Sequence, residues 1–303
     1  MTMPNFFIIG AQKAGTTSLY HYLRQHPQVY MSPVKEPFFF NHEIGPDGRV
    51  VKESFGGPGR SRNPKFADLE EYRALFEGVK EELAVGEASV LYIYVPGTAE
   101  RIERYAPGAK AIALLRDPAE RAYSAFLNAV RGGREPLSDF ARALREEEGR
   151  VRENWAYVFR YRSRGFYHAQ LERYYEVFGR ERVGVWLYED LKEDPVGVSQ
   201  SVFRFLGVDD SFVPDASLRH NPASVPKGEA ARLAIRFMNT MLPAVRKVVP
   251  SAYKVRRLVN TRILTEESPP LDPGVRAELI EGYREDVLKL EELIGRDLSA
   301  WLR

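Results

Sequence analysis

The chain has 303 residues, of which 44% are hydrophobic, 28% charged and 12% aromatic. This composition excludes a disordered chain, a collagen and a coiled coil, and the length is sufficient to bury a full core. The 44 Lys and Arg nearly balance the 42 Asp and Glu, so a net charge of +2 argues against a protein that coats nucleic acid. Because the chain has no cysteine, disulfides, thiolate metal sites and cysteine nucleophiles are excluded, which fits a reducing compartment.

The positive charge is unevenly distributed. Residues 227–262 contain nine Lys and Arg and one acid, Glu229, so this segment carries +8 and the rest of the chain is net negative. Such a segment is a candidate for contact with an anion or a membrane surface, and a solvated helical face explains it equally well. The sequence leaves both interpretations open.

Short apolar runs alternate with helical patterns along the chain. The runs at residues 6–9, 111–115 and 183–187 are continuous, which predicts strands covered on both faces. The spacing of apolar residues predicts helices at residues 17–25, 119–131, 167–178 and 196–206. This alternation of strands and helices predicts an α/β fold with a P-loop-like parallel sheet flanked by helices and right-handed crossovers.

The remaining stretches complete the expected organisation. Long surface loops are predicted where glycine and proline are frequent, at residues 43–66 and 214–228. Residues 271–303 predict a closing amphipathic helix whose Trp301 packs back onto the core. We expect one domain over residues 1–303, with a core at 5–210 and a basic and helical C-terminal region at 211–303.

Nothing in the sequence predicts a membrane span or a secretory signal. No stretch approaches the roughly 20 apolar residues that a span requires. The apolar run at residues 6–9 is followed at once by Gly10 and Lys13, so it is too short for a signal core. We therefore expect a cytoplasmic protein.

A glycine loop joins the first predicted strand to the first predicted helix. A Walker-type phosphate loop has a glycine, four residues, then Gly, Lys and Ser or Thr. Gly10 and Gly15 keep this spacing and Thr17 has the last place, but Thr16 stands where the lysine would be and the lysine is Lys13. Because glycines let successive N–H groups face a phosphate at a helix N-terminus, the loop predicts an anion cradle. The alternative is a plain tight turn.

Three segments, in this order, carry a resemblance to a known family. They are residues 7–19 (Phe-Ile-Ile-Gly-Ala-Gln-Lys-Ala-Gly-Thr-Thr-Ser-Leu), 35–40 (Lys-Glu-Pro-Phe-Phe-Phe) and 114–124 (Leu-Leu-Arg-Asp-Pro-Ala-Glu-Arg-Ala-Tyr-Ser). They resemble the 5′-phosphosulfate loop, the Lys-Glu-x-x-Phe-Phe element and the 3′-phosphate motif of sulfotransferases that use 3′-phosphoadenylyl sulfate (PAPS). The resemblance is to the heparan-sulfate-type branch and its bacterial relatives, and it covers residues 6–207.

The resemblance implies transfer of a sulfuryl group from PAPS to a hydroxyl or amine of a carbohydrate, lipid or other small acceptor, with adenosine 3′,5′-bisphosphate (PAP) as product. A sulfuryl group carries less negative charge than a phosphoryl group, so cationic side chains can replace a bridging metal, and no metal is expected. Expected partners are PAPS, PAP and the acceptor, without nucleic acid or a transmembrane segment; peripheral membrane contact stays open. The alternatives are a P-loop-type kinase or NTPase and a non-catalytic protein that binds anions or membrane surfaces.

On the donor side, the resemblance implies roles for residues of the first and third motifs and for four residues further along the chain. Lys13 would neutralise charge on the bridging oxygen as the nucleotide leaves, and the 5′-phosphate would be held by Ala14, Gly15, Thr16, Thr17 and Ser18. A guanidinium at the end of a strand can fork onto two phosphate oxygens, so Arg116, with Ser124, is assigned to the 3′-phosphate. The alternative for Arg116 is an ion pair with Asp117 or Glu120. Further nucleotide contacts are assigned to Ser163, Tyr167, Lys227 and Gly228.

On the acceptor side, Glu36 is the candidate general base, with aromatic neighbours that would desolvate it. The alternative is a surface Lys35–Glu36 pair beside core phenylalanines, and His42 is the reserve base. The family branch has a lysine in a Gly-Glu-Lys-Thr-Pro element, but residues 86–90 read Gly-Glu-Ala-Ser-Val and lack it. Lys35, Glu87 and Ser89 are still assigned to the acceptor cleft, whereas a polysaccharide acceptor is not carried over.

Overall fold

The computed structural model describes residues 2–51, 65–217 and 268–303, together with a few single positions between 228 and 235. Most of the two predicted loops, and nearly all of the basic segment at 227–262, lie outside the described residues. The predictions for that segment therefore stay predictions.

In the described part of the chain, five strands form one sheet in the order β2-β3-β1-β4-β5. Their bounds are β1 Phe6–Gly10, β2 Val29–Met31, β3 Ala84–Ala88, β4 Lys110–Leu115 and β5 Val183–Leu187. Every pairing is parallel, which confirms the predicted α/β class. The apolar run of β1 is continuous because this strand is central and buried along its whole length.

Two of the strands were not predicted from the sequence. β2 (Val-Tyr-Met) is too short to be recognised as a strand, and β3 reads Ala-Val-Gly-Glu-Ala, in which a glycine and an acid interrupt the apolar run. The glycine in β3 has a packing reason: a Cβ at Gly86 would lie 2.2 Å from the ring of Phe6 on the neighbouring strand. The polar residue in β3, Glu87, is also completely buried.

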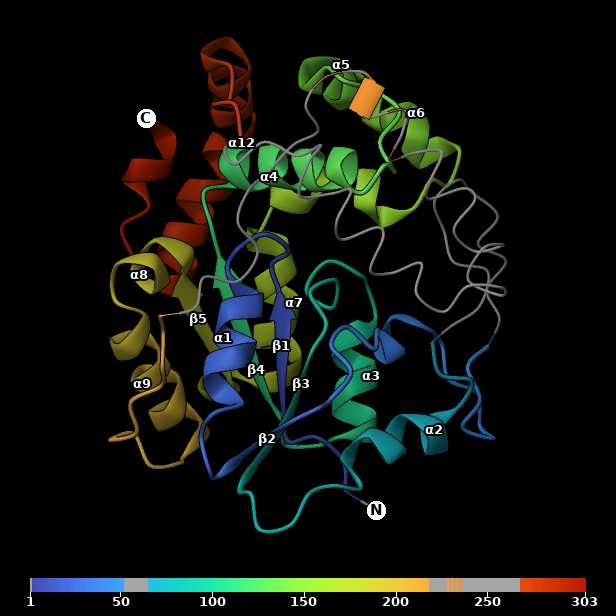
Figure 1. Cartoon of the computed structure of the whole chain (residues 1–303), viewed down its shortest axis with the longest axis vertical. Helices are drawn as coiled ribbons and strands as arrows, with labels where there is room; N and C mark the ends of the chain where they lie inside the picture. Colours follow the sequence, from blue (N-terminus) through green and yellow to red (C-terminus); the bar gives the residue numbers. More distant parts are fainter. Residues whose placement is uncertain are drawn as a thin grey trace.

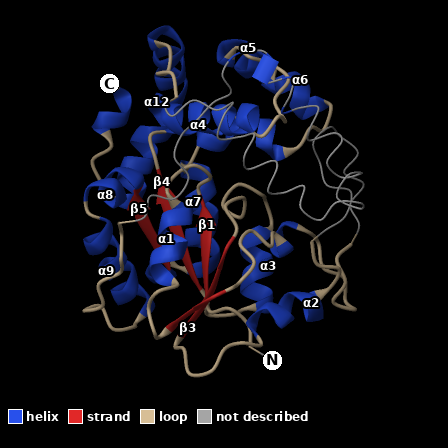
Figure 2. Cartoon of the chain, viewed as in Figure 1, coloured by secondary structure: helices blue, strands red, loops and turns tan. Residues whose placement is uncertain are grey.

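Helices cover both faces of the sheet (Figure 1). One face carries α1 (Thr16–Leu23) and α9 (Pro195–Leu206), and the other carries α3 (Thr98–Tyr105) and α7 (His168–Phe178). α12 (Pro273–Ile294) packs against α7 and α4 (Pro118–Arg131). Figure 2 shows the strands as a twisted fan between these two layers. The loops that connect the strands to helices of both layers therefore meet at the carboxyl ends of the central strands.

α4 (Pro118–Arg131) crosses above the carboxyl ends of the strands in Figure 1. With α1, α7 and α9, it confirms the four helices predicted ahead of the C-terminal region. Between residues 65 and 217, five shorter helices were not predicted, and four of them have only five or six residues, too few to show a helical period. Besides α3, they are α2 (Leu69–Arg73), α5 (Phe140–Arg145), α6 (Glu147–Arg152) and α8 (Tyr188–Glu193).

The C-terminal helix is shorter than the stretch predicted at residues 271–303. α12 begins after the cap Asp272, whose carboxylate accepts from two backbone N–H groups, and it ends at Gly295 with a φ of 64°. The chain then turns back, and Trp301 is buried with its ring centre 6.2 Å from that of Tyr167, as predicted.

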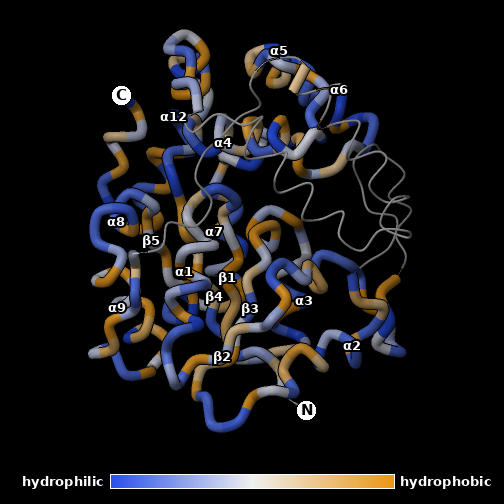
Figure 3. The backbone as a smooth tube through the Cα atoms, viewed as in Figure 1, coloured by the Kyte–Doolittle hydropathy of each residue, from blue (hydrophilic) through white to orange (hydrophobic). Residues whose placement is uncertain are grey.

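Hydrophobic residues concentrate along the strands, whereas α6 is mostly hydrophilic (Figure 3). Among the described residues, no helix combines the length and the apolarity that crossing a bilayer would require.

Candidate active site

The predicted motifs come together at the carboxyl edge of the sheet. The glycine loop follows β1, Arg116 follows β4, and Ser89 follows β3. The segment that carries Lys35 and Glu36 follows β2. Because all strands are parallel, these four segments lie at one edge, where α/β proteins bind their ligands.

Close packing explains both glycines of the loop. A Cβ at Gly10 would lie 2.5 Å from Ile93, and one at Gly15 would lie 2.9 Å from Leu191. Gly15 has a φ of +88°, which favours glycine, and it is the N-cap of α1. Within the described residues no side chain caps the first turn of α1, so its N–H groups remain suited to an anion.

Lys13 lies among several charged side chains. The pKa of its ammonium is lowered to about 8, mainly by burial and also by the positive charges of Arg131, Arg116 and Lys35, while the charge of Glu36 opposes them. The loop, the 3′-phosphate motif and the Glu36 segment are thus electrostatically linked at one place. Cations held this close repel one another, so the arrangement favours the binding of a polyanion between them.

Arg116 connects the loop to α4. Its guanidinium donates to the backbone carbonyl of Lys13 at 3.3 Å and lies 4.8 Å from the ring centre of Tyr188. It also forms an ion pair with Glu120 at 3.3 Å, as the alternative interpretation predicted. Because Glu120 is partly exposed, this pair is weak and a phosphate can compete for the guanidinium.

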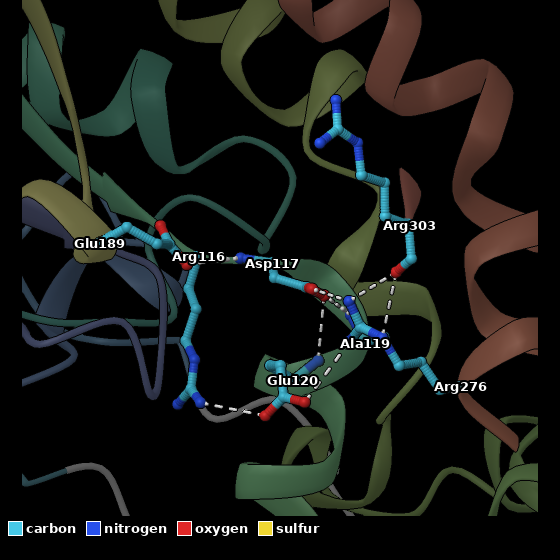
Figure 4. Close-up of polar contacts among 7 residues, drawn as sticks. All are labelled: Arg116, Asp117, Ala119, Glu120, Glu189, Arg276 and Arg303. Atoms are coloured by element: carbon cyan, nitrogen blue, oxygen red, sulfur yellow. Dashed lines mark hydrogen bonds and ion pairs between the residues drawn. The ribbon is translucent and has the colours of Figure 1, made fainter. Parts of the chain in front are cut away.

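Asp117 is bound from the C-terminal helix (Figure 4). Its carboxylate accepts from two backbone N–H groups in the first turn of α4 and pairs with Arg276 of α12 at 2.8 Å. Arg276 also reaches Glu120 at 3.5 Å and donates to the carbonyl of Arg303. Of the two acids offered as alternative partners of Arg116, the structure therefore shows Glu120, because Asp117 is paired with Arg276. α12 thereby holds the start of α4 beside Arg116.

Two further assigned residues lie next to this site. Tyr167 is buried, and its phenol donates to the backbone carbonyl of Arg116 at 3.1 Å; burial raises the pKa of that phenol. The Ser163 hydroxyl lies 3.2 Å from the phenol oxygen of Tyr94, and its backbone N–H donates to Glu147 at 2.9 Å. Tyr167 therefore supports Arg116, and the contact of both residues with a nucleotide stays a prediction.

The other nucleotide assignments are less defined. Ser124 is half-buried in α4, eight residues after Arg116. Lys227 lies outside the described residues, and its neighbour Gly228 is exposed with a φ of +86°. The roles assigned to these three residues stay predictions.

Glu36 lies on a segment with an unusual backbone. Its φ is 58° and that of Phe38 is 57°, both in the left-handed region. The ammonium of Lys35 lies 3.3 Å from the Glu36 carboxylate, so the predicted Lys–Glu pair is present. The ammonium of Lys65 donates to the backbone carbonyls of Lys35 and Glu36 at 3.1 and 2.8 Å. Phe39 and Phe40 are buried in the core, so the predicted phenylalanines of the core are present beside this pair.

Comparison with known proteins decides the family. The model described as "Sulfotransferase family" matches residues 4–212. The chain belongs to the sulfotransferase family. Its structure superposes on that of a sulfotransferase from Alicyclobacillus acidocaldarius with a TM-score of 0.76 and 39% identity, over 100% of both chains. The family resemblance of the three motifs is thereby confirmed.

Two curated relatives are longer than this chain. The membrane-associated sulfotransferase kil1 of Dictyostelium discoideum is 36% identical over 126 residues, 42% of this chain and 23% of kil1. The bifunctional heparan sulfate N-deacetylase/N-sulfotransferase 4 of Mus musculus is 26% identical over 309 residues, 99% of this chain and 31% of that protein. The chain thus spans less than a third of the length of either relative.

In this sulfotransferase-family chain, Glu87 and Ser89 lie in the interior. Neither is exposed to solvent, so their contact with an acceptor stays a prediction. The Glu87 carboxylate accepts from Tyr92 and Ser89, each at 2.7 Å, and from Tyr72 at 3.2 Å. Burial raises the pKa of Glu87 to about 7, although the three hydroxyls oppose this. For the reserve base His42, burial and the Arg101 charge lower the pKa.

Sequence reasoning missed two buried arginines behind the glycine loop. Arg164 donates to the side-chain oxygen of Gln12 at 2.8 Å, and burial lowers the pKa of its guanidinium to about 9, with a further contribution from Arg121. Arg121 donates to the carbonyl of Tyr161, while its Nε and Nη1 have no partner among the described residues. Arg121 belongs to the 3′-phosphate motif, but nothing in the sequence signals that it is buried.

Proposed function

We propose that the protein transfers a sulfuryl group from PAPS to a hydroxyl or amine of an acceptor. The observation that carries the proposal is the position of Lys13. Its ammonium is partly buried in the loop after β1, with a pKa lowered to about 8, and it is coupled to Arg116 and to Glu36. One group of charges therefore contains a cation for the 5′ end of the donor, a cation for its 3′-phosphate and a carboxylate for the acceptor proton.

The reaction follows from these charges. The acceptor oxygen or nitrogen attacks sulfur, and the bond between sulfur and the 5′-phosphate oxygen breaks. PAP leaves with the electron pair, and the ammonium of Lys13 stabilises the charge that develops on its oxygen. The Glu36 carboxylate takes the acceptor proton. Holding acceptor, sulfur and leaving oxygen in line converts a bimolecular step into one within the complex.

Arg116 and Ser124 are proposed to select the donor. The 3′-phosphate distinguishes PAPS from ATP, and a guanidinium can bind two of its oxygens at once. Arg116 is suited to this because the acid with which it forms an ion pair, Glu120, is partly exposed and can be exchanged for a phosphate. A kinase or NTPase would lack this requirement and would need Mg²⁺ to bridge its phosphates.

Equilibrium binding in EDTA tests the donor. Isothermal titration calorimetry should show PAP binding at least tenfold more tightly than ADP, because ADP lacks the 3′-phosphate that Arg116 contacts. Arg116→Met should remove most of this preference. Tighter binding of ADP, or binding that requires Mg²⁺, would instead support the kinase or NTPase alternative.

The acceptor is the open part of the proposal. Sugars, lipids and other small molecules with a hydroxyl or amine all need the same base, and Ala88 stands where the heparan-sulfate-type branch has its lysine. Incubation with PAPS carrying radioactive sulfur and a panel of such acceptors identifies the class. Once an acceptor is known, Glu36→Gln should slow transfer about 100-fold or more while PAP binding is kept. Full transfer by this variant would show that another group is the base.

A further inference from the structure

Glu87 is the centre of a buried hydrogen-bond network on β3. Its carboxylate accepts from three hydroxyls, those of Ser89, Tyr92 and Tyr72. A hydroxyl that donates its one proton to a carboxylate can still accept through its oxygen. Because the ionised carboxylate can only accept, each hydroxyl must donate its proton to Glu87, and its oxygen is left to accept from another group.

Two of these hydroxyls accept from the segment that carries Glu36. The backbone N–H of Phe38 donates to Ser89 at 3.0 Å, and that of Phe40 donates to Tyr92 at 3.2 Å. The N–H of Glu36 itself donates to the carbonyl of Ala88 at 2.8 Å. Alternate N–H groups of residues 36–40 are thus all bound to the end of β3 and the turn after it.

The segment requires such anchoring because of its backbone. Glu36 and Phe38 both have a φ near 58°, a left-handed conformation that is unfavourable for a non-glycine residue and persists only when the surroundings impose it. Pro37, between them, has no N–H to contribute. The hydroxyls that Glu87 orients supply two of the three backbone anchors described above.

We propose that Glu87 is a positioning residue for the general base: its buried carboxylate orients Ser89 and Tyr92 so that they hold residues 36–40, and with them the Glu36 carboxylate, in the conformation that accepts the proton. The inference rests on the proposed function in so far as Glu36 is the base. The positioning of the segment itself does not depend on that assignment.

Glu87→Gln probes the network with little change of shape. A glutamine places its NH₂ group either toward Ser89 or toward the two tyrosines, and the hydroxyls that face it lose the acceptor for their own protons. At pH 8 we expect kcat for sulfuryl transfer to fall about tenfold or more, while the Kd for PAP changes less than twofold. A Kd that rises as much as kcat falls would overturn the proposal, since Glu87 would then affect nucleotide binding.

A double variant tests whether Glu87 acts through Glu36. If it does, Glu36→Gln with Glu87→Gln should transfer sulfuryl no more slowly than Glu36→Gln alone, because the base that Glu87 positions is already gone. Effects that multiply would contradict a positioning role. If Glu36→Gln alone keeps full activity, the base assignment of the proposed function fails, and the measurement below still decides the structural part.

That measurement is amide hydrogen exchange, which requires no activity. In Glu87→Gln the N–H groups of Phe38 and Phe40 should exchange at least about tenfold faster than in the wild type, while amides in the centre of β1 keep their protection. Unchanged protection of these two amides would overturn the proposal. Faster exchange throughout the chain would indicate general destabilisation and would overturn it too.

Two tyrosines provide a matched pair. Tyr92 and Tyr72 are both completely buried and both donate to the same oxygen of Glu87, but of the two only Tyr92 accepts from the backbone N–H of Phe40. Tyr92→Phe should therefore lower kcat about fivefold or more, and Tyr72→Phe should have a clearly smaller effect. Equal effects of the two variants would show that loss of the anchor is not the cause.

Discussion

The guanidinium of Arg116 donates to the backbone carbonyl of Lys13 at 3.3 Å, although 103 residues separate the two in the sequence. The contact arises because β1 and β4 are neighbours and end at the same edge of the sheet. The loop proposed to hold the 5′-phosphate and the arginine proposed to hold the 3′-phosphate thus form one unit, so changes at either should affect the same donor molecule.

Lys13→Met should lower kcat by about 100-fold or more, because the leaving oxygen loses the cation that stabilises its charge. The melting temperature should stay the same or rise, since the wild-type ammonium is desolvated and repelled by neighbouring cations. Steady-state kinetics and a thermal melt measure the two quantities. Full activity in this variant would contradict the role of the loop lysine.

PAP binding should take up protons above neutral pH. In the nucleotide-free protein the pKa of Lys13 is about 8, so at pH 8.5 most of its amine is neutral. A bound phosphate favours the charged form, so roughly half a proton or more should be taken up per nucleotide at pH 8.5 and much less at pH 7. Calorimetry in buffers with different ionisation enthalpies measures this uptake. Lys13→Met is the control and should show none; equal uptake in the control would assign the proton elsewhere.

Glu87 should make stability depend on pH. Its pKa is about 7 in the folded protein and close to 4.5 in the unfolded chain. Between pH 4.5 and pH 7 the folded protein therefore keeps a proton on Glu87 that the unfolded chain has lost. Raising the pH from 4.5 to 7 should therefore cost on the order of 3 kcal/mol of unfolding free energy at this residue. Urea unfolding of the wild type and of Glu87→Gln across this range isolates the effect. A difference between the two that does not change with pH would contradict it.

Arg276→Met should weaken PAP binding indirectly, through the acids at the start of α4. The Asp117 carboxylate would lose its partner at 2.8 Å, and Glu120 would be left to pair with Arg116, which competes with the 3′-phosphate. We expect the Kd for PAP to rise about three- to tenfold, corresponding to roughly 1 kcal/mol. Arg284→Met is a matched control, since Arg284 lies on the same helix and, within the part of the chain that the structure describes, pairs only with Glu281 one turn away. Equal losses in both variants would rule out a specific effect of Arg276.

Much of the donor side could be predicted from the sequence. The strand, the two glycines and Lys13 lie within ten residues, so short-range pattern is sufficient to recognise the loop. Less of the acceptor side could be predicted from the sequence. Glu87 was assigned to the acceptor cleft, whereas the structure buries it beneath the Glu36 segment, and no pattern in Ala-Val-Gly-Glu-Ala indicates a central strand with a buried acid.

The sequence by itself determined the parallel α/β class, the family motifs and the residues of the loop, because each depends on neighbours along the chain. Only the tertiary structure decided which charges meet: Arg276 with Asp117, Lys65 with the backbone of Glu36, and Glu87 with hydroxyls that anchor Phe38. These contacts join residues from separate elements, and their geometry depends on how the helices and strands pack. Spacing along the chain carries no information about that packing.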